Sequence, residues 1–381
     1  MAVKNENGAT ARFFNQWAQK HELEYDADNR VVRSHGQTIS ITSVINQLKV
    51  ESDNVADVSL ARIPPTVAVW FEIEKAKAFQ ALKNNLNQVG YTPTFLLSLK
   101  HWVAALASDG IEESTQILAH WMWGVKRRIL FPHLPVGNII MPVFVGPSQA
   151  GKTTAVERLF SPLRGVKASF DVDQITDSRN FKALEENYIV FCDEMVGFSR
   201  ACAGEFKRIL TERSLDYRVL GTNITDRAIM NASFIGTSNH PLSTILHDTT
   251  SAMRFWEVRC RQDIDHREVN ETDYELLWQE LDASEDSPLD SKMLTRIRGL
   301  QDGKLRPRGA IESWLEDIEL QPGYEFRTYQ DLWKLFRQWC EDTGEYYKPT
   351  MRRFCAELRQ FQFTPMKREN GAKGIGVKLL K

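Results

Sequence analysis

The sequence predicts an α/β core with a largely parallel sheet, flanked by a mainly helical N-terminal domain and a small C-terminal domain. Between residues 136 and 262, short apolar runs alternate with helical stretches, a pattern typical of a parallel sheet covered by helices. Before this region, apolar residues recur at helical spacing. The chain ends in two amphipathic segments followed by a hairpin pattern.

Composition excludes several classes of protein. A chain of 381 residues has room for two or three domains. With 42% hydrophobic and 26% charged residues, it is an ordinary globular chain, and disorder throughout is excluded. The net charge of −2 excludes a uniformly basic nucleic-acid coat protein but permits a local basic patch.

The five cysteines are scattered and form no C-x-x-C pair, which favours a reducing compartment and no structural metal. We find neither a signal peptide nor an apolar run that could cross a membrane. The expected location is therefore the cytoplasm, with no membrane partner.

The N-terminal domain, residues 1–135, is expected to be helical. Apolar stripes predict helices in residues 11–21, 99–106 and 114–129, and their aromatic side chains are expected to pack in a core. Pro64 and Pro65 are expected to break any helix at that point. With no catalytic constellation, this domain is expected to act as a collar for oligomerisation, as a partner-docking surface, or as both.

Three strands are expected in the core domain, residues 136–262. The runs 139–145, 188–192 and 233–237 are apolar in the manner of buried strands, and residues 155–160 open a helix. Pro142 is awkward in a central strand and weakens the first half of the first run.

The motif G-x-x-x-x-G-K-[ST] occupies residues 146–153, between a predicted strand and a predicted helix. Its glycines let backbone N–H groups wrap around phosphates. Lys152 would reach the β and γ phosphates, and the Thr153 hydroxyl would bind Mg²⁺. The predicted ATP-binding residues are Gly146, Pro147, Ser148, Gln149, Ala150, Gly151, Lys152, Thr153 and Thr154.

Polar residues follow the two later strands. Asp193 is expected to orient the Mg²⁺ shell together with Thr153, and Glu194 to polarise the attacking water. Asn239 ends the next run and could bind the γ-phosphate or the lytic water. Arg254 could stabilise phosphoryl charge from a neighbouring subunit. The alternatives are solvent-exposed acids, a strand-ending asparagine and a surface arginine.

Together these motifs resemble the superfamily 3 helicases, and among them the virulence-associated E and poxvirus-type primase-helicase proteins of phages, plasmids and mobile islands. The motif residues are Gly146 to Thr153, Asp193-Glu194, Gly236 to Asn239 and Arg254-Phe255-Trp256. The resemblance implies an AAA+-like P-loop ATPase core with catalytic residues Lys152, Asp193, Glu194, Asn239 and Arg254. It also implies a ring, usually a hexamer, on single-stranded DNA. Met253 stands where the family often has a second arginine.

The same resemblance implies that Lys207, Arg208 and Arg218 contact DNA in the pore of a ring. The alternative is a helix with a solvated basic face and a structural arginine. Residues 263–290 carry eleven Asp or Glu and one Arg, a net charge of 1 − 11 = −10. We interpret residues 263–310 as an acidic helical extension and linker.

Residues 311–381 are expected to form a basic winged-helix-like domain. Amphipathic helices are predicted at 328–341 and 350–360, and a hairpin at 361–380 with Asn370-Gly371 as its turn. Residues 346–381 carry nine Lys or Arg and two Glu, a net charge of 9 − 2 = +7. The predicted phosphate contacts are Arg352, Arg353, Lys367, Arg368 and Lys373. The alternative is a packing domain or a protein-docking surface.

These observations favour an ATP-hydrolysing DNA translocase or helicase that supports replication of a phage, plasmid or mobile element. Its cofactors would be ATP and Mg²⁺. Its partners would be single-stranded or forked DNA, copies of the same chain in a ring (a hexamer), and host or phage replication proteins. Two alternatives stay open: a nucleotide-switched replication loader or adaptor, and a P-loop ATPase that acts on protein without nucleic acid.

Overall fold

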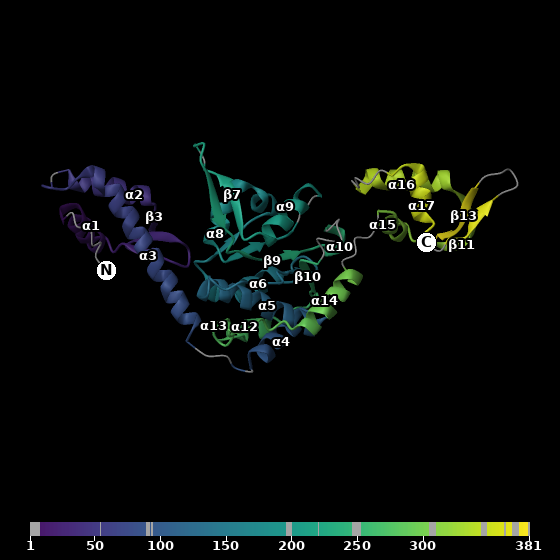
Figure 1. The fold of residues 1–381 in the computed structure, drawn as a ribbon, viewed down its shortest axis with the longest axis horizontal. Helices are drawn as coiled ribbons and strands as arrows, with labels where there is room; N and C mark the ends of the chain where they lie inside the picture. The colour runs from purple at the N-terminus through teal and green to yellow at the C-terminus, as the bar shows by residue number, and fades with distance from the viewer. Residues whose placement is uncertain are drawn as a thin grey trace. The chain divides into compact units, whose positions relative to one another are not determined.

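The computed structural model describes residues 8–53, 55–88, 92, 94–195, 200–219, 221–245, 253–304, 310–343, 349–361, 363–367 and 373–379. The chain divides into two compact units, the first of residues 1–246 and 250–303 and the second of residues 247–249 and 304–381. Each unit is described by itself below, with the elements labelled as in Figure 1. Within the described residues, none of the helices is long and apolar enough to cross a membrane.

The first unit begins with a small mixed layer. Its elements are α1 (Gly8–Lys20), β1 (Glu24–Asp26), β2 (Val31–Ser34), β3 (Gln37–Ile39), α2 (Ile41–Ser52), η1 (Leu60–Arg62) and α3 (Ile63–Leu86). The three strands form an antiparallel sheet in the order β1-β2-β3. Phe14, Trp17, Leu48, Val67 and Trp70 are part of its buried core. The expected helices are present, but this short sheet was not expected.

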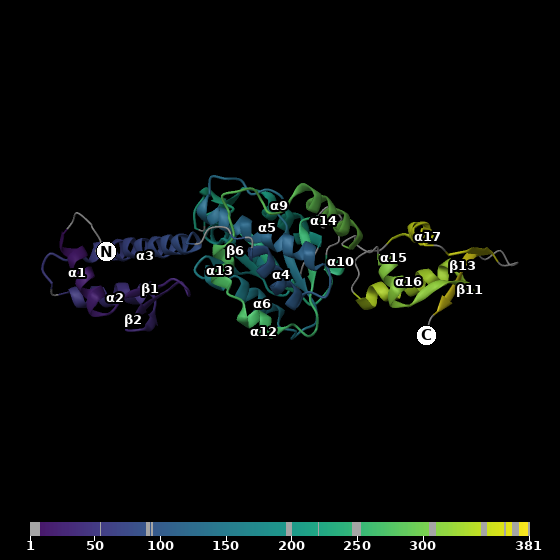
Figure 2. The same cartoon turned by 90° about the horizontal axis from the view of Figure 1, so that it is seen from below.

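Pro64 and Pro65 begin a helix rather than break one. They stand in the first turn of α3, which runs for 24 residues and is visible as a long helix in Figure 2. The first N–H groups of a helix have no intrahelical partner, so a proline there loses no hydrogen bond. The expectation of a break at this point was therefore wrong.

A five-stranded parallel sheet forms the centre of the first unit. Its strands are β4 (Met141–Val145), β5 (Lys167–Ser169), β6 (Ile189–Cys192), β9 (Ser233–Ser238) and β10 (Phe255–Arg259). Their order is β10-β4-β9-β6-β5, and every neighbouring pair is parallel. The predicted α/β fold with a parallel sheet is confirmed. Because β9 lies between β4 and β6, the carboxyl ends of these three strands meet at one edge.

Pro142 occupies a central strand without breaking a ladder. The N–H of Met141 donates to the Arg254 carbonyl at 2.7 Å, so it points towards β10. The nitrogen of the next residue faces the opposite side, towards β9. The pairing of β4 with β9 starts only at Val143, which lies opposite Gly236. The N–H that proline lacks is therefore not needed.

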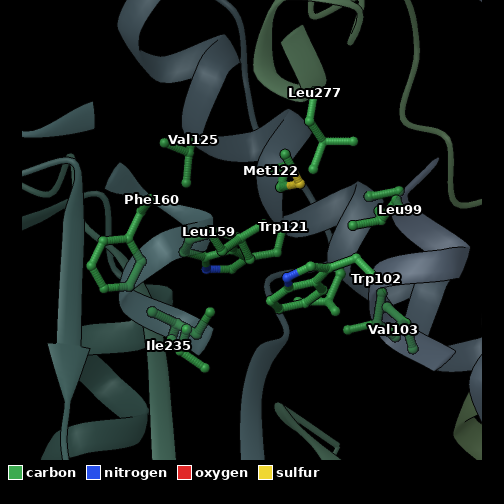
Figure 3. Packing of buried hydrophobic residues seen from close by; sticks show 14 of the residues in the cluster. Leu99, Trp102, Val103, Trp121, Met122, Val125, Leu159, Phe160, Ile235 and Leu277 are labelled. Carbon is green, nitrogen blue, oxygen red and sulfur yellow. The ribbon is translucent and has the colours of Figure 1, made fainter. Parts of the chain in front are cut away.

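Helices cover both faces of this sheet. One face packs against α4 (Thr94–Leu106), α5 (Ile111–Leu130), α6 (Lys152–Leu159), α12 (His266–Glu271) and α13 (Tyr274–Gln279). Figure 3 shows Trp102 of α4 and Trp121 of α5 beside Leu159 of α6 and Ile235 of β9. On the other face, Phe206 of α9 (Arg200–Thr211) contacts the rings of Phe234 and Phe255.

The remaining elements of this unit connect or border the sheet. They are η2 (Ser161–Leu163), α7 (Val172–Thr176), η3 (Ser178–Asn180), α8 (Phe181–Glu186), β7 (Ser214–Arg218), β8 (Thr225–Ile229), α10 (Leu242–Ile245) and α14 (Ser291–Lys304). Strands β7 and β8 form an antiparallel hairpin between α9 and β9. The hairpin stands out from the sheet in Figure 1.

The core of the sheet extends beyond residues 136–262 in both directions. Trp102 and Trp121 precede this range, and Trp278 follows it, yet all three belong to one buried cluster. Their indole N–H groups are satisfied: Trp121 donates to the Phe234 carbonyl at 2.9 Å, and Trp278 to the Leu159 carbonyl at 2.7 Å. Buried tryptophans with such partners fix how the helices seat on the sheet.

The acidic stretch 263–290 is helical, as expected, but it packs on the core of the first unit and is not a free linker. Tyr274, Leu277, Trp278 and Leu281 are buried against α4 and α5. The Nζ atom of Lys126 on α5 donates to the carbonyls of Trp278, Gln279 and Leu281 at 2.7, 3.0 and 2.6 Å. These bonds satisfy carbonyls at the C-terminal end of α13. A count of charges does not reveal this apolar face, so the linker part of the interpretation was wrong while the helical part was right.

A buried histidine in this core should make the stability of the protein depend on pH. The His120 Nε2 atom donates to the Asn138 carbonyl at 2.9 Å, and its Nδ1 atom lies 2.6 Å from the Ser287 hydroxyl. Burial lowers the pKa of His120 from its ordinary value of 6.5. The unfolded chain therefore binds this proton more readily than the folded one. Stability should fall as the pH drops through 6.5 towards the folded pKa.

This prediction can be checked by urea unfolding between about pH 7.5 and 5.5, a range that spans the ordinary histidine pKa. His120 can contribute a slope of at most about 1.4 kcal/mol per pH unit. His120→Gln should flatten the dependence of stability on pH, because it removes this proton-binding site. The other seven histidines are still present, so the slope that remains is due to other groups. An equal slope in both proteins would contradict it.

The second unit has the order helix, strand, helix, helix and hairpin. Its elements are α15 (Ala310–Asp317), β11 (Leu320–Thr328), α16 (Tyr329–Thr343), α17 (Met351–Leu358), β12 (Pro365–Lys367) and β13 (Lys373–Leu379). The strands form an antiparallel sheet in the order β11-β13-β12. Trp314, Phe336 and Phe354 centre its core. Helix α15 and strand β11 were not expected, and the predicted turn Asn370-Gly371 lies outside the described residues.

Candidate active site

The loop after β4 takes a conformation that its glycines permit. Gly151 has φ +91°, and a Cβ added to it would lie 2.4 Å from the His266 Cε1 atom. A Cβ on Gly146 would lie 3.0 Å from the Cys260 Cβ atom. Gln149 also has a positive φ, of +62°. The loop then enters α6, whose first N–H groups have no intrahelical partner and can bind an anion.

Lys152 is held inside this loop. The residue is buried, and its Nζ atom donates to the carbonyls of Gly146 and Pro147 at 2.8 and 2.6 Å. A third bond runs to the Asn239 Oδ1 atom at 3.0 Å. Burial lowers the pKa of the Lys152 ammonium, while nearby Cys260, Glu194 and Asp193 act in the opposite direction. The cation is thus fixed where the loop would enclose a phosphate.

Two hydroxyl groups converge on one carboxylate oxygen. Thr153 Oγ1 donates to Asp193 Oδ1 at 2.9 Å, and Thr237 Oγ1 donates to the same atom at 2.7 Å. The Thr237 hydroxyl also accepts from the Glu194 N–H at 3.0 Å. Thr237 therefore positions both acidic residues. It was not predicted as a site residue, because its position opposite Asp193 depends on the pairing of β9 with β6.

Glu194 leaves β6 in an unusual backbone conformation. Its φ is +49°, a region that residues other than glycine rarely adopt. Such conformations cost free energy and concentrate at functional sites. The Glu194 Oε1 atom accepts from the Asn239 Nδ2 atom at 3.0 Å. The turn therefore brings the carboxylate to the carboxyl edge of β9, beside the loop that holds Lys152.

These residues border a cavity of about 290 Å³. It is lined by Ser148, Gln149, Gly151, Lys152, Thr153, Thr154, Glu194, Thr237 and Asn239. Six of the nine predicted loop residues thus line one cavity together with Glu194 and Asn239, and Asp193 reaches the same place through Thr153. The other three, Gly146, Pro147 and Ala150, do not line it. A hydroxyl and a carboxylate 2.9 Å apart are hard oxygen donors that suit Mg²⁺, which usually keeps waters and phosphate oxygens as its other ligands.

Arg254 lies at the other end of the sheet. It directly precedes β10, and its carbonyl accepts from the N–H of Met141, the first residue of β4. At about 3.3 Å per residue, a five-residue strand places Arg254 roughly 17 Å from the carboxyl edge. Its Nε atom is buried and has no partner among the described residues, and burial lowers the pKa of the guanidinium. Arg254 therefore does not join Lys152 within one chain.

The predicted DNA-contacting residues of the core lie on α9 and β7. Arg208 is engaged by two carboxylates, with Nε 3.0 Å from Glu205 Oε2 and Nη1 3.1 Å from Glu212 Oε2. Lys207 is its neighbour on α9, and Arg218 is exposed at the end of β7. Arg208 is therefore already paired with Glu205 of α9 and with Glu212, which follows the helix, whereas Arg218 offers an exposed charge beside the hairpin turn.

The predicted contacts of the second unit lie on α17 and the hairpin. Arg352 is exposed, and the Arg353 Nε atom donates to Glu357 Oε1 at 2.9 Å. Lys367 of β12 and Lys373 of β13 pair across the hairpin, and both are exposed. Arg368 lies outside the described residues. The unit thus carries exposed basic side chains on a helix and on a sheet.

The fold and the site are those expected of an α/β NTPase core. Within that class, residues 98–287 match the model of the virulence-associated protein E-like domain. The chain carries this domain, and the resemblance to virulence-associated E proteins inferred from the motifs is confirmed.

Comparison with curated proteins gave no match. Among solved structures, the apo structure of the NrS-1 C-terminal region is 12% identical, with 99% of this chain and 100% of that one covered and a TM-score of 0.43. The X-ray structure of JCV helicase is 10% identical, with 77% and 92% covered and a TM-score of 0.36. Both TM-scores lie below 0.5.

Proposed function

We propose that this protein is a Mg²⁺-dependent ATPase that moves along DNA during replication of a phage, plasmid or mobile element. The observation that carries the proposal is the set of contacts joining Lys152, Asn239 and Glu194 at one edge of the sheet. A phosphate-binding cation, a polar side chain and a carboxylate meet there beside the loop cavity. That combination serves hydrolysis of a phosphoanhydride and has no evident structural use.

Each residue has a role in this reaction. The loop amides and Lys152 bind the β and γ phosphates, and Thr153 and Asp193 would hold Mg²⁺. The ion supplies charge neutralisation on the phosphate oxygens when bound. Glu194 accepts a proton from the attacking water, while Asn239 holds the carboxylate in place and can donate to the γ-phosphate. Thr237 fixes the relative positions of Asp193 and Glu194.

The reaction would be completed by a neighbouring copy. Arg254 stands at the amino end of β10, away from its own phosphate loop, with an Nε atom that lacks a partner among the described residues. A closed ring, expected to be a hexamer, presents such a residue to the site of the next subunit. We therefore propose a homo-oligomeric ring with sites shared between subunits.

DNA is the substrate that the charge distribution favours. The chain has a net charge of −2, yet residues 346–381 carry +7. Segregated positive charge is the electrostatic footprint of a nucleic-acid-binding domain. The second unit also has a helix, strand, helix, helix and hairpin order that supports a winged-helix-like assignment. Single-stranded or forked DNA and host or phage replication proteins are the proposed partners.

Two assays distinguish this function from its alternatives. Stimulation of the ATPase by single-stranded DNA separates a DNA motor from an ATPase that acts on protein alone. Displacement of a paired strand with ATP, but not with a non-hydrolysable analogue, separates a helicase from a nucleotide-switched loader. Absence of stimulation at low salt, where binding to phosphates is strongest, would contradict the proposal.

Removal of the second unit should weaken DNA binding and spare basal hydrolysis. The buried core of that unit is made of residues between 311 and 377, so a chain ending at residue 303 keeps the core of the first unit intact. Every residue assigned to the ATPase site lies upstream. The affinity for DNA should fall, and its salt slope should decrease by about 0.7–0.9 for each phosphate that the shortened chain no longer neutralises. Unchanged affinity and slope, measured by fluorescence anisotropy, would favour a protein-docking role.

A further inference from the structure

Strand β11 contains a bulge that projects one aromatic side chain into solvent. Pro322 and Glu325 both pair with Val377 of β13, so Gly323 and Tyr324 are extra residues in the ladder. Tyr324 is 98% exposed. Among the described residues, the Tyr324 side chain makes neither a hydrogen bond nor a ring contact. Because bulges change the direction of side chains, the exposure of Tyr324 follows from the backbone.

Glycines hold this bulge in place. A Cβ on Gly376 would lie 2.3 Å from the Gly323 oxygen, and a Cβ on Gly323 would lie 2.6 Å from the Val377 oxygen. A Cβ on Gly374 would lie 2.1 Å from the Arg327 oxygen. These distances are far below van der Waals contact, so β11 and β13 can approach in this way only with glycine at all three positions. The sequence therefore specifies the bulge.

The surrounding sheet is basic. Arg327, Lys367, Lys373 and Lys378 are exposed on its three strands, and Glu325 is the single acidic residue of those strands. Within the part of the unit that the structure describes, these four cations form no ion pair. An exposed aromatic ring on a sheet that also carries unpaired cations complements a ligand that combines flat rings with repeated negative charge.

We propose that Tyr324 is a stacking platform for an unpaired nucleobase, and that the basic residues of the same sheet bind the neighbouring phosphates. This inference rests on the proposed function and adds to it a preference of the second unit for single strands. In a duplex the faces of the bases are covered by their neighbours, whereas in a single strand a base can stack on an aromatic side chain. The cations favour this ligand over a protein partner, which an aromatic residue alone would also fit.

The test uses the full chain and fluorescence anisotropy with three probes: a short single strand, the same strand with abasic sites in place of its bases, and the corresponding duplex. Tyr324→Ala should weaken binding of the intact single strand by about 5- to 150-fold. Binding of the abasic strand and the duplex should stay as in the wild type. The salt slope should also stay the same, because every cation that binds a phosphate is still present.

Three variants serve as controls. Tyr324→Phe keeps the ring and should keep the affinity. Arg327→Gln should weaken all three probes and reduce the salt slope, since it removes a charge and no ring. Leu335→Ala, at a 52% exposed position on α16, should change nothing.

The outcomes separate this inference from the proposed function. If the wild type binds the single strand and Tyr324→Ala binds it equally well, or loses affinity equally for the abasic strand, the stacking role is overturned while DNA binding stands. If the wild type binds none of the probes, both are overturned. If Tyr324→Ala instead changes self-association in sedimentation while DNA binding is intact, Tyr324 is a contact between copies and the inference is wrong.

Discussion

Glu194→Gln is expected to bind ATP and Mg²⁺ as the wild type does and to lose almost all hydrolysis. The substitution keeps the shape of the side chain and its position beside the Asn239 amide, but an amide cannot accept a proton from water. Loss of a general base typically costs about 10²- to 10⁴-fold in rate. A steady-state phosphate-release assay measures the rate, and calorimetric titration with a non-hydrolysable analogue measures binding.

Glu157→Gln is the matched control, since Glu157 is exposed on α6 and lines no part of the loop cavity. It should leave both measurements unchanged. Lys152→Ala should behave differently from Glu194→Gln, because removing the cation weakens binding of the nucleotide itself. Hydrolysis by Glu194→Gln at the wild-type rate would show that another residue activates the water.

Arg254→Ala is expected to lower hydrolysis by about 10³- to 10⁵-fold, the range typical for removal of an arginine that stabilises phosphoryl transfer from a neighbouring subunit. Nucleotide affinity should change little, because Arg254 lies at the opposite end of the sheet from its own phosphate loop. The surface variant Arg267→Ala, which breaks only an exposed pair with Glu271, should have no effect.

Mixing two inactive proteins tests whether Arg254 acts across an interface. An interface between an Arg254→Ala subunit and a Glu194→Gln subunit holds both wild-type residues in one of its two orientations. With random equal mixing, roughly one interface in four should be active in a head-to-tail ring. Recovery of that order supports action in trans. Absence of recovery, with subunit exchange verified by labelled protein, would place the role of Arg254 within its own chain.

The motif residues could be located from sequence because their geometry is local. The phosphate loop is fixed by eight consecutive residues, and the strand ends that carry Asp193 and Asn239 follow from apolar runs whose carboxyl ends must share an edge. Thr237 could not be assigned in this way. Its hydroxyl reaches Asp193 only because β9 lies beside β6, and strand order is a property of the whole fold.

Net charge and the presence of proline gave wrong expectations where tertiary packing or the position of a helix start determines the structure. The net charge of residues 263–290 hides Trp278 and Leu277, which α4 and α5 bury. Pro64 and Pro65 are compatible with a helix because they stand in its first turn, and the sequence alone does not show where α3 starts. The strands β1 to β3 contain three or four residues each, too few to show a period of two in the sequence.

The position of Arg254 at the amino end of β10 also has a consequence for how the protein would be controlled in a cell. If each catalytic centre needs two copies, the rate per molecule depends on how much protein is present, since dilution separates the copies. At low abundance the chain would bind ATP without consuming it. Synthesis above the assembly concentration would then switch hydrolysis on, so the amount of protein made would itself act as the signal, with no separate regulatory ligand.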